Sequence, residues 1–419
     1  MAFTSLILFL LAVYLRPGEI IPAWRGFPIA YVVLPICALL TGLGLIFRRD
    51  FAPVRADLYA VLFLVVAMIS TIVNGWSGGV LMVLTTLGPS IIGYFVTRCA
   101  VGSIPSLERA GRLIVLLSAF LAGNGLLQYY TGHGLGDVQA LTVSAVTPDA
   151  QPDEESDAET RIRGTGIFND PNDLAFALVI GAPLTFWLWR STRGVLKKSL
   201  SLAALGTIVY AIALTRSRGG LLGLALGLAP LLNRHFGRKT QIAALALGGL
   251  IFAATASGRM STFNASEASA QGRIEAWSAG LQMLKTHPVF GVGFGNFLDY
   301  HELVAHNSYI HTLAELGLVG GFAFVSLVGL FLLAWRGLPK DASGDASAAW
   351  LAGGTGALMC CVFISRQYSA PLFMVFAIGG SIAAIRQLPH PWWLEPVFGV
   401  ATVVLVGAVY VAVGALGAW

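Results

Sequence analysis

Thirteen apolar runs follow one another along this chain, and each is about long enough to cross a lipid bilayer. A membrane-spanning helix needs about 20 apolar residues, and fewer where flanking side chains reach the interface. Each run must be helical, because lipid offers no partners for free backbone polar groups. The runs are residues 2–16, 27–47, 57–74, 79–97, 111–130, 172–190, 198–214, 217–233, 241–257, 307–335, 348–365, 370–386 and 396–418.

These runs predict an all-α integral membrane protein with about twelve to fourteen transmembrane helices, in a single polytopic domain over residues 1–419. The composition agrees, because 56% of the residues are hydrophobic and 11% are charged, against about 25% charged in soluble domains. A soluble protein of this length could not bury so much apolar surface, which excludes a soluble globular enzyme. The first run has neither a basic n-region nor a small-residue cleavage site, so we expect a membrane helix and not a signal peptide.

Basic residues in short loops predict the orientation, because they are enriched on the cytoplasmic side. With a cytoplasmic N-terminus, sixteen of the 26 Lys and Arg residues fall inside, and the acidic stretch 148–159 falls outside. The net charge of +5 is thus spread over topology signals, which disfavours nucleic-acid binding. The inside residues are Arg48, Arg49, Arg55, Arg98, Arg109, Arg112, Arg190, Arg193, Lys197, Lys198, Arg234, Arg238, Lys239, Arg336, Lys340 and Arg386.

Two long segments lie on the outer side, residues 131–171 and 258–306. The first is acidic and opens with a Gly-, Asp- and Pro-rich stretch that we expect to be mobile. The second contains a predicted amphipathic helix over 273–288, outside the bilayer, and leads into the helix 307–335. The chain has no evident internal repeat, so the inverted repeats of many transporters are absent.

Neither a disulfide framework nor a metal site is predicted. The cysteines all lie in or beside apolar runs, where small packing residues are expected. Three histidines (301, 306 and 311) lie five residues apart, which is a poor spacing for three ligands on one face. The cysteines are Cys37, Cys99, Cys360 and Cys361.

Ten basic residues fall on the outer side against the topology bias, and four of them lie in distinctive local motifs. The motifs with these arginines are RGTGIFNDPNDLA (163–175), TRSRGG (215–220) at the outer end of a helical hairpin, and GRIEAW (272–277). Two further motifs follow downstream, HPVFGVGFGNF (287–297) and HNSYIHTLAELGLVGG (306–321). The glycines of 291–295 lack the GK[ST] and the preceding strand of a phosphate loop, so a turn is expected there.

In this order the motifs resemble the bacterial O-antigen ligase/polymerase family, from Arg163 to about Trp335. The most specific element is His306–Asn307, nine residues, and then Gly-x-x-Gly, here Gly317 and Gly320. The resemblance implies a lipid-phosphate-dependent, GT-C-like glycosyltransferase in the bacterial inner membrane, with a periplasmic active site.

The donor that the resemblance implies is a glycan on a polyprenyl pyrophosphate such as undecaprenyl pyrophosphate. The acceptor is a hydroxyl of lipid A–core in the ligases, or of a second lipid-linked glycan in the polymerases of O-antigen and exopolysaccharide. The family uses neither a nucleotide sugar at this step nor a metal, so no cofactor is expected.

The outer arginines fit a pyrophosphate leaving group, because guanidinium groups bind phosphate oxygens in a fork and stay charged. A low-dielectric boundary strengthens that stabilisation. Some of them could instead cap helices or bind lipid headgroups. Arg366, in SRQYS, is a weaker candidate. The pyrophosphate-binding candidates are Arg218, Arg216, Arg163 and Arg273.

His306 is the candidate general base, because an imidazole that titrates near about 6.5 can accept a hydroxyl proton. Asn307 is expected to cap the following helix, whose positive end disfavours an imidazolium and could also hold an anion. The alternative is a histidine with a purely structural hydrogen bond.

Three further residues are predicted to have supporting roles at this site. His311 and Glu315 form an i,i+4 pair inside the long helix, and a buried Glu315 would take an arginine as its partner. Asn172, with Asn169 and Pro171, is expected to form a turn and a helix start after Arg163.

The predicted reaction is a single displacement in which His306 deprotonates the acceptor, arginines hold the departing pyrophosphate, and the anomeric carbon is inverted. A lipid-linked glycan flippase would also need arginines, but as a path of charges through the membrane. A purely structural assembly partner would need neither motif. Ligase and polymerase share the donor site, so the residues leave both open.

Overall fold

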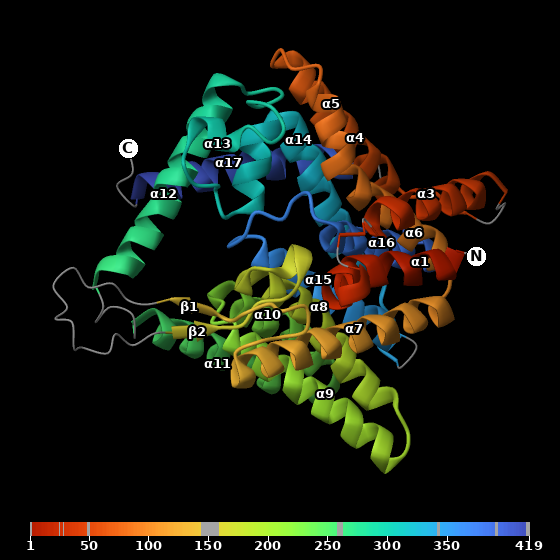
Figure 1. Cartoon of the computed structure of the whole chain (residues 1–419). Helices are drawn as coiled ribbons and strands as arrows, with labels where there is room; N and C mark the ends of the chain where they lie inside the picture. The colour runs from red at the N-terminus through yellow and green to blue at the C-terminus, as the bar shows by residue number, and fades with distance from the viewer. Residues whose placement is uncertain are drawn as a thin grey trace. The chain divides into compact units, whose positions relative to one another are not determined.

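The computed structural model describes residues 2–24, 26–27, 29–47, 51–143, 159–257, 263–341, 344–389 and 393–415. The chain divides into two compact units, each assembled from three stretches of sequence (Figure 1). Unit 1 comprises residues 1–44, 103–267 and 338–360, and unit 2 comprises residues 45–102, 268–337 and 361–419. The inside residues Arg48 and Arg49 and the acidic stretch 148–158 lie outside the described residues.

The all-α prediction is confirmed, and each of the thirteen predicted spans overlaps a helix. Three shorter apolar helices cover Ala2–Leu15, Val32–Ile46 and Ala370–Ile385. The helices over the predicted spans 217–233, 241–257 and 348–365 are too short or too weakly apolar to be counted as membrane-spanning by length and composition. Within the described residues, seven helices are long and apolar enough to cross a membrane: Arg55–Val73, Gly79–Ala100, Ile104–Thr131, Pro171–Ser191, Val195–Leu214, Ser308–Gly337 and Leu394–Ala415.

Unit 1 is a helical body, and its described residues include a short antiparallel strand pair in the first outer segment. The pair aligns Leu141 with Arg161 and Val143 with Glu159. Its elements are α1 (Ala2–Leu10), η1 (Leu11–Leu15), α2 (Pro17–Ile20), η2 (Pro22–Trp24), most of α3 (Ile29–Phe47), α7 (Ile104–Thr131), β1 (Leu141–Val143), β2 (Glu159–Arg161), η3 (Gly166–Phe168), α8 (Pro171–Ser191), α9 (Val195–Leu214), α10 (Arg218–Phe236), α11 (Arg238–Ser257) and α15 (Asp345–Cys360).

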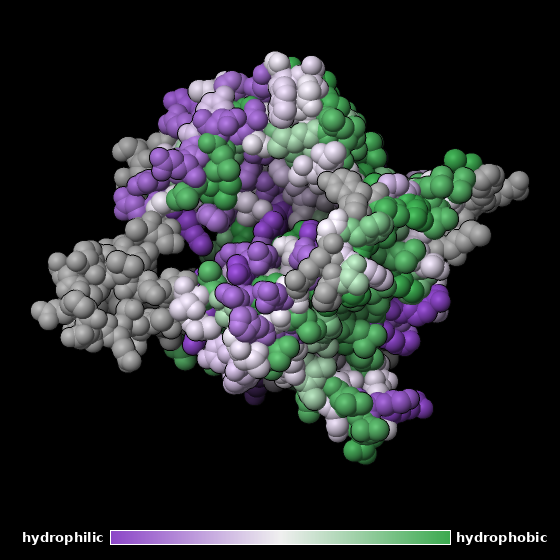
Figure 2. Space-filling view, in the orientation of Figure 1, coloured by the Kyte–Doolittle hydropathy of each residue, from purple (hydrophilic) through white to green (hydrophobic). Residues whose placement is uncertain are grey.

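Apolar side chains face outward along the surface helices of unit 1, as Figure 2 shows over α3 and α9. Leu39 of α3 is 63% exposed, and Val195 of α9 is 84% exposed. Aliphatic side chains exposed in such rows are expected to contact lipid, because water would penalise a contiguous apolar face. The helix α8, by contrast, is buried along most of its length.

Small residues let α10 and α15 approach until their backbones touch. A Cβ added to Gly223 would lie 2.7 Å from the carbonyl oxygen of Gly356, and one added to Gly356 would lie 2.5 Å from that of Gly223. Gly353 of α15 meets the carbonyl of Ile180 in α8 in the same way. Close backbone packing of this kind holds membrane helices together where lipid removes the hydrophobic driving force.

Gly223→Ala is expected to lower the free energy of unfolding by about 1–3 kcal/mol, because the added methyl group overpacks the α10–α15 contact. Gly206→Ala on α9 is the matched control, since nothing lies within 4 Å of a Cβ added there. The control should be neutral or stabilising, because alanine favours a helix more than glycine does. Thermal unfolding in detergent micelles measures both, and equal midpoints would contradict the expectation.

Unit 2 packs its helices around α14, which contacts α4, α16 and α17 (Figure 1). The predicted amphipathic helix over 273–288 lies in α12, which begins earlier and ends at Thr286. The elements are α4 (Arg55–Val73), α5 (Gly79–Thr86), α6 (Gly88–Ala100), most of α12 (Phe263–Thr286), α13 (Phe297–Tyr300), α14 (Ser308–Leu333), η4 (Ala334–Gly337), α16 (Ala370–Ile385) and α17 (Leu394–Ala415).

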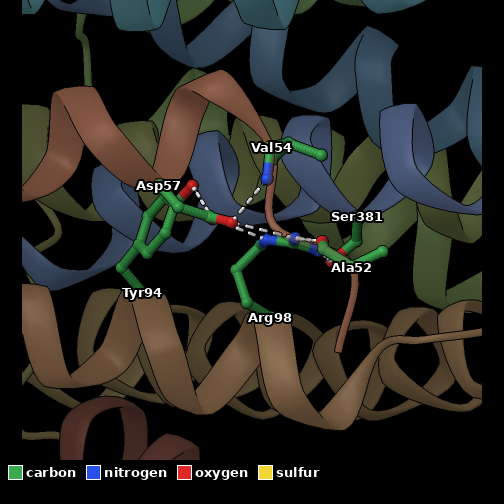
Figure 3. Close-up of polar contacts among 6 residues, drawn as sticks. All are labelled: Ala52, Val54, Asp57, Tyr94, Arg98 and Ser381. Carbon is green, nitrogen blue, oxygen red and sulfur yellow. Dashed lines mark hydrogen bonds and ion pairs between the residues drawn. The ribbon is translucent and has the colours of Figure 1, made fainter. Parts of the chain in front are cut away.

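A buried ion pair joins the start of α4 to the end of α6 (Figure 3). Arg98 donates from Nε to Oδ1 of Asp57 at 2.8 Å and from Nη2 to Oδ2 at 3.1 Å. Tyr94 donates its hydroxyl to Oδ1 at 2.7 Å, and the Val54 amide donates to Oδ2 at 2.9 Å. Arg98 Nη2 also donates to the carbonyl of Ala52 at 2.7 Å. The carboxylate therefore accepts four hydrogen bonds, as a buried charge requires.

Candidate functional site

Two of the predicted arginines lie at the turn between α9 and α10 in unit 1. Arg216 is exposed and has a left-handed backbone with φ of 53°, and Arg218 is the first residue of α10 and half-buried. Ser217 caps α10, because its hydroxyl accepts a hydrogen bond from the amide of Gly220 at 3.1 Å. The predicted hairpin therefore presents two guanidinium groups at the N-terminus of a helix, where anions are favoured.

The strand β2 and the residues after it bind to that same turn. Arg161 donates from Nε to the carbonyl of Thr215 at 2.9 Å, and the amide of Ile162 donates to the carbonyl of Leu214 at 3.3 Å. Arg163 instead donates from Nε to the carbonyl of Gln139 at 2.8 Å. These backbone contacts bring Arg161, Arg163 and the two arginines of the turn into one part of unit 1.

Arg161 was missed by the sequence analysis, although a signal was present. The sequence Arg161–Ile162–Arg163 alternates charged and apolar residues, and a strand places such residues i and i+2 on one face. The predicted turn and helix start after Arg163 are confirmed. Asp170 caps α8 by accepting from the amide of Asn172 at 2.8 Å and from its side chain at 2.9 Å.

The other predicted residues belong to unit 2, around the N-terminus of α14. Asn307 is the N-cap as predicted, because its side-chain oxygen accepts from the amides of Tyr309 at 3.0 Å and Ile310 at 3.1 Å. His306 precedes the cap with a φ of 46°, in the left-handed region. A non-glycine residue held in this region is costly, and such residues gather at functional sites.

The helix α14 is interrupted at Gly317, whose φ of 65° and ψ of −163° are not helical. The loop after α12 pairs with the interrupted turn. The amide of Gly293 donates to the carbonyl of Glu315 at 3.1 Å, and that of Leu318 donates to the carbonyl of Pro288 at 2.8 Å. A Cβ on Gly317 would clash with the backbone of Val289. The Gly-x-x-Gly motif and the glycine-rich loop thus form one structural unit.

The side chain of Glu315 joins three segments of unit 2. Its Oε1 accepts from the amide of Phe297 at 3.1 Å and lies 3.0 Å from Nε2 of His311, so the predicted i,i+4 pair is confirmed. Its Oε2 accepts the hydroxyl of Tyr368 at 2.8 Å. Burial and the Glu315 carboxyl group hold the pKa of Tyr368 well above its usual value, which keeps the phenol a donor. These partners replace the arginine that was expected.

The segment 361–369 folds onto the first turns of α14. Ser308 donates its amide to the carbonyl of Cys361 at 2.8 Å and its hydroxyl to that of Ile364 at 2.6 Å. One turn later, Nδ1 of His311 lies 2.9 Å from the hydroxyl of Ser365. The predicted span 348–365 is therefore wrong at its end, because α15 stops at Cys360 where these carbonyls turn toward α14.

The predicted site residues are thus divided between the two units. The polar residues Ser365 and Tyr368 of SRQYS were missed, although this cluster between two apolar runs was a signal. Among the described residues, no group of three or more His, Cys, Asp or Glu side chains could hold a metal ion. Unit 1 holds Arg163, Arg216, Arg218 and Asn172, and unit 2 holds Arg273, His306, Asn307, His311, Glu315 and Arg366.

Part of the chain matches a known family. Residues 202–325 match the family model described as O-antigen ligase. The matched stretch includes the arginine turn of unit 1, the helix α12, the loop after it, His306 and the interrupted turn of α14. No match was found among curated proteins.

Proposed function

Because residues 202–325 match the family model described as O-antigen ligase, we propose that this chain transfers a glycan from a polyprenyl-pyrophosphate donor to an acceptor hydroxyl. The reaction takes place at the periplasmic face of the bacterial inner membrane, with the N-terminus in the cytoplasm. The observation that carries the proposal is the backbone of His306. It is held in a left-handed conformation immediately before the N-cap of α14.

The imidazole of His306 takes the proton of the acceptor hydroxyl. The acceptor oxygen forms a bond to the anomeric carbon as the bond from that carbon to the pyrophosphate oxygen breaks. The electron pair leaves with the polyprenyl pyrophosphate, and a single displacement inverts the anomeric centre. Asn307 supports this role, because its cap fixes the backbone that carries the imidazole.

The arginines bind the pyrophosphate before and after the bond breaks. Guanidinium forks match phosphate oxygens and stay charged at every relevant pH. Arg216 and Arg218 stand at a helix N-terminus that favours the same charge, and Arg163 lies beside that turn. Arg273, in α12, is a further guanidinium that we propose for this role. The residues supply positive charge and a proton acceptor, which are the two groups that this transfer needs.

The test uses purified protein in lipid vesicles, with a polyprenyl-pyrophosphate glycan as the sugar substrate. His306→Ala is expected to lower the transfer rate by on the order of 100-fold or more, because the general base is lost. His133→Ala is the control, since this histidine of unit 1 has a side chain that is 58% exposed. Products are resolved by size.

The products also separate the two variants of the proposal and the rival class. A ladder that requires His306 identifies a polymerase, and a single transfer that requires added lipid A–core identifies a ligase. A glycan that crosses the bilayer unchanged, with no new glycosidic bond under any condition, would overturn the proposal in favour of a flippase. A trapped glycosyl-enzyme would overturn the single displacement.

A further inference from the structure

The conformation of His306 needs support on both sides, because a left-handed backbone is not the preferred state of a histidine. On the C-terminal side, the cap of Asn307 fixes the chain to the first turn of α14. On the N-terminal side, the indole Nε1 of Trp277 donates to the carbonyl oxygen of Ala305 at 2.8 Å. That carbonyl belongs to the peptide that contains the amide nitrogen of His306.

This second contact is anchored in the core of unit 2. Ala305 is fully buried, and the ring of Trp277 packs against the buried cluster around it. The indole cannot move without disturbing that packing, so its N–H is a fixed donor. The buried cluster consists of Met283, Val292, Phe297, Ala305, Ile310 and Ala314.

The face of α12 that carries Trp277 lies alongside the segment that leads to His306. A Cβ added to Gly272 would lie 3.1 Å from the side chain of Leu303, and Trp277 bonds to the residue two further on, Ala305. Arg273 precedes Trp277 by four residues, and residues i and i+4 lie on one face of a helix. Arg273 is therefore on the side of α12 that faces the segment 303–306.

We infer that Trp277 is a positioning residue for His306: its indole N–H fixes the peptide before the histidine, and with it the direction of the imidazole relative to Arg273. The inference rests on the proposed role of His306 as the base. Trp277 does not touch the reacting atoms in this account. It sets the geometry of a group that must reach the acceptor hydroxyl, and such geometry controls the rate strongly.

The test is Trp277→Phe, which keeps an aromatic ring in the core and removes the N–H donor together with part of the indole ring system. Trp350→Phe is the matched control, because its buried indole Nε1 donates to the carbonyl of Leu107 at 3.1 Å in unit 1. Both variants lose one indole–carbonyl hydrogen bond and part of one indole ring, and the unfolding midpoint of each is measured. The kcat and the donor KM are measured in vesicles and divided by the folded fraction.

Trp277→Phe is expected to lower kcat by on the order of tenfold or more with the donor KM unchanged, because the base is displaced while the donor site is intact. Trp350→Phe is expected to leave both constants unchanged. A wild-type kcat in Trp277→Phe, or an equal loss in both variants, would overturn the inference while the proposed function stands. A fully active His306→Ala would overturn the proposed function itself.

Discussion

Replacing Arg98 by alanine is expected to lower the free energy of unfolding by about 3–5 kcal/mol. The guanidinium makes two hydrogen bonds to Asp57, and the two side chains are only 3% and 11% exposed. Without Arg98, the carboxylate is left buried with the Tyr94 hydroxyl and one backbone amide as partners (Figure 3). The loss is measured by thermal or SDS-induced unfolding of the purified protein in micelles, followed by helix content.

The control is Arg112→Ala, because Arg112 pairs with Glu108 at 3.1 Å through side chains that are 53% and 35% exposed. An exposed pair on one helix contributes little, so the change should stay within about 0.5 kcal/mol. The double variant Asp57→Ala/Arg98→Ala should lose less than the sum of the two single losses, since neither charge is then left alone. Equal losses for Arg98→Ala and Arg112→Ala would contradict the prediction.

Glu315→Ala is expected to lower the free energy of unfolding by about 3 kcal/mol or more. The carboxyl group accepts from the Phe297 amide and the Tyr368 hydroxyl and pairs with His311. Each buried donor that loses its acceptor costs about 1–3 kcal/mol. The variant also releases two loops that pack on α14, so glycan transfer in vesicles should fall with stability.

Two milder variants should give smaller losses of stability. Tyr368→Phe removes one donor and leaves the carboxyl group in place, so a loss of about 0.5–1.5 kcal/mol is expected. Glu315→Gln should fall between the other two, because a carboxamide offers one acceptor oxygen where the carboxyl group uses two. The order of the three unfolding midpoints is the measurement, and a Glu315→Ala midpoint no lower than that of Tyr368→Phe would refute the network.

Predictions from hydropathy were accurate for the location of helices. A run such as 172–190 is apolar enough to need lipid or protein around it, and lipid permits only a helix; α8 begins at Pro171 and ends at Ser191. Caps were predictable for the same local reason. The oxygen of Asn307 reaches amides two and three residues away, so no distant part of the chain decides whether it can cap.

Helix interruptions were not predictable, because distant partners decide them. The apolar run after Cys360 could continue a helix, but Ser308 binds the carbonyls of Cys361 and Ile364 from far along the chain. The run around Gly317 also reads as continuous helix. Its carbonyls and amides pair with the loop 288–293 instead, and only the folded unit brings that loop to them.

The candidate site shows the same division. The sequence by itself determined the polytopic helical frame, the histidine that precedes a capped helix, and the arginines of the outer motifs. These depend on periodicity, charge and neighbours within a helical turn. The tertiary structure alone decided which side chains meet. Arg161 reaches a carbonyl 54 residues away, and Tyr368 reaches a carboxyl group 53 residues away. Contacts over such separations depend on how helices pack, because backbone hydrogen bonding within a helix leaves the choice of partner helix open.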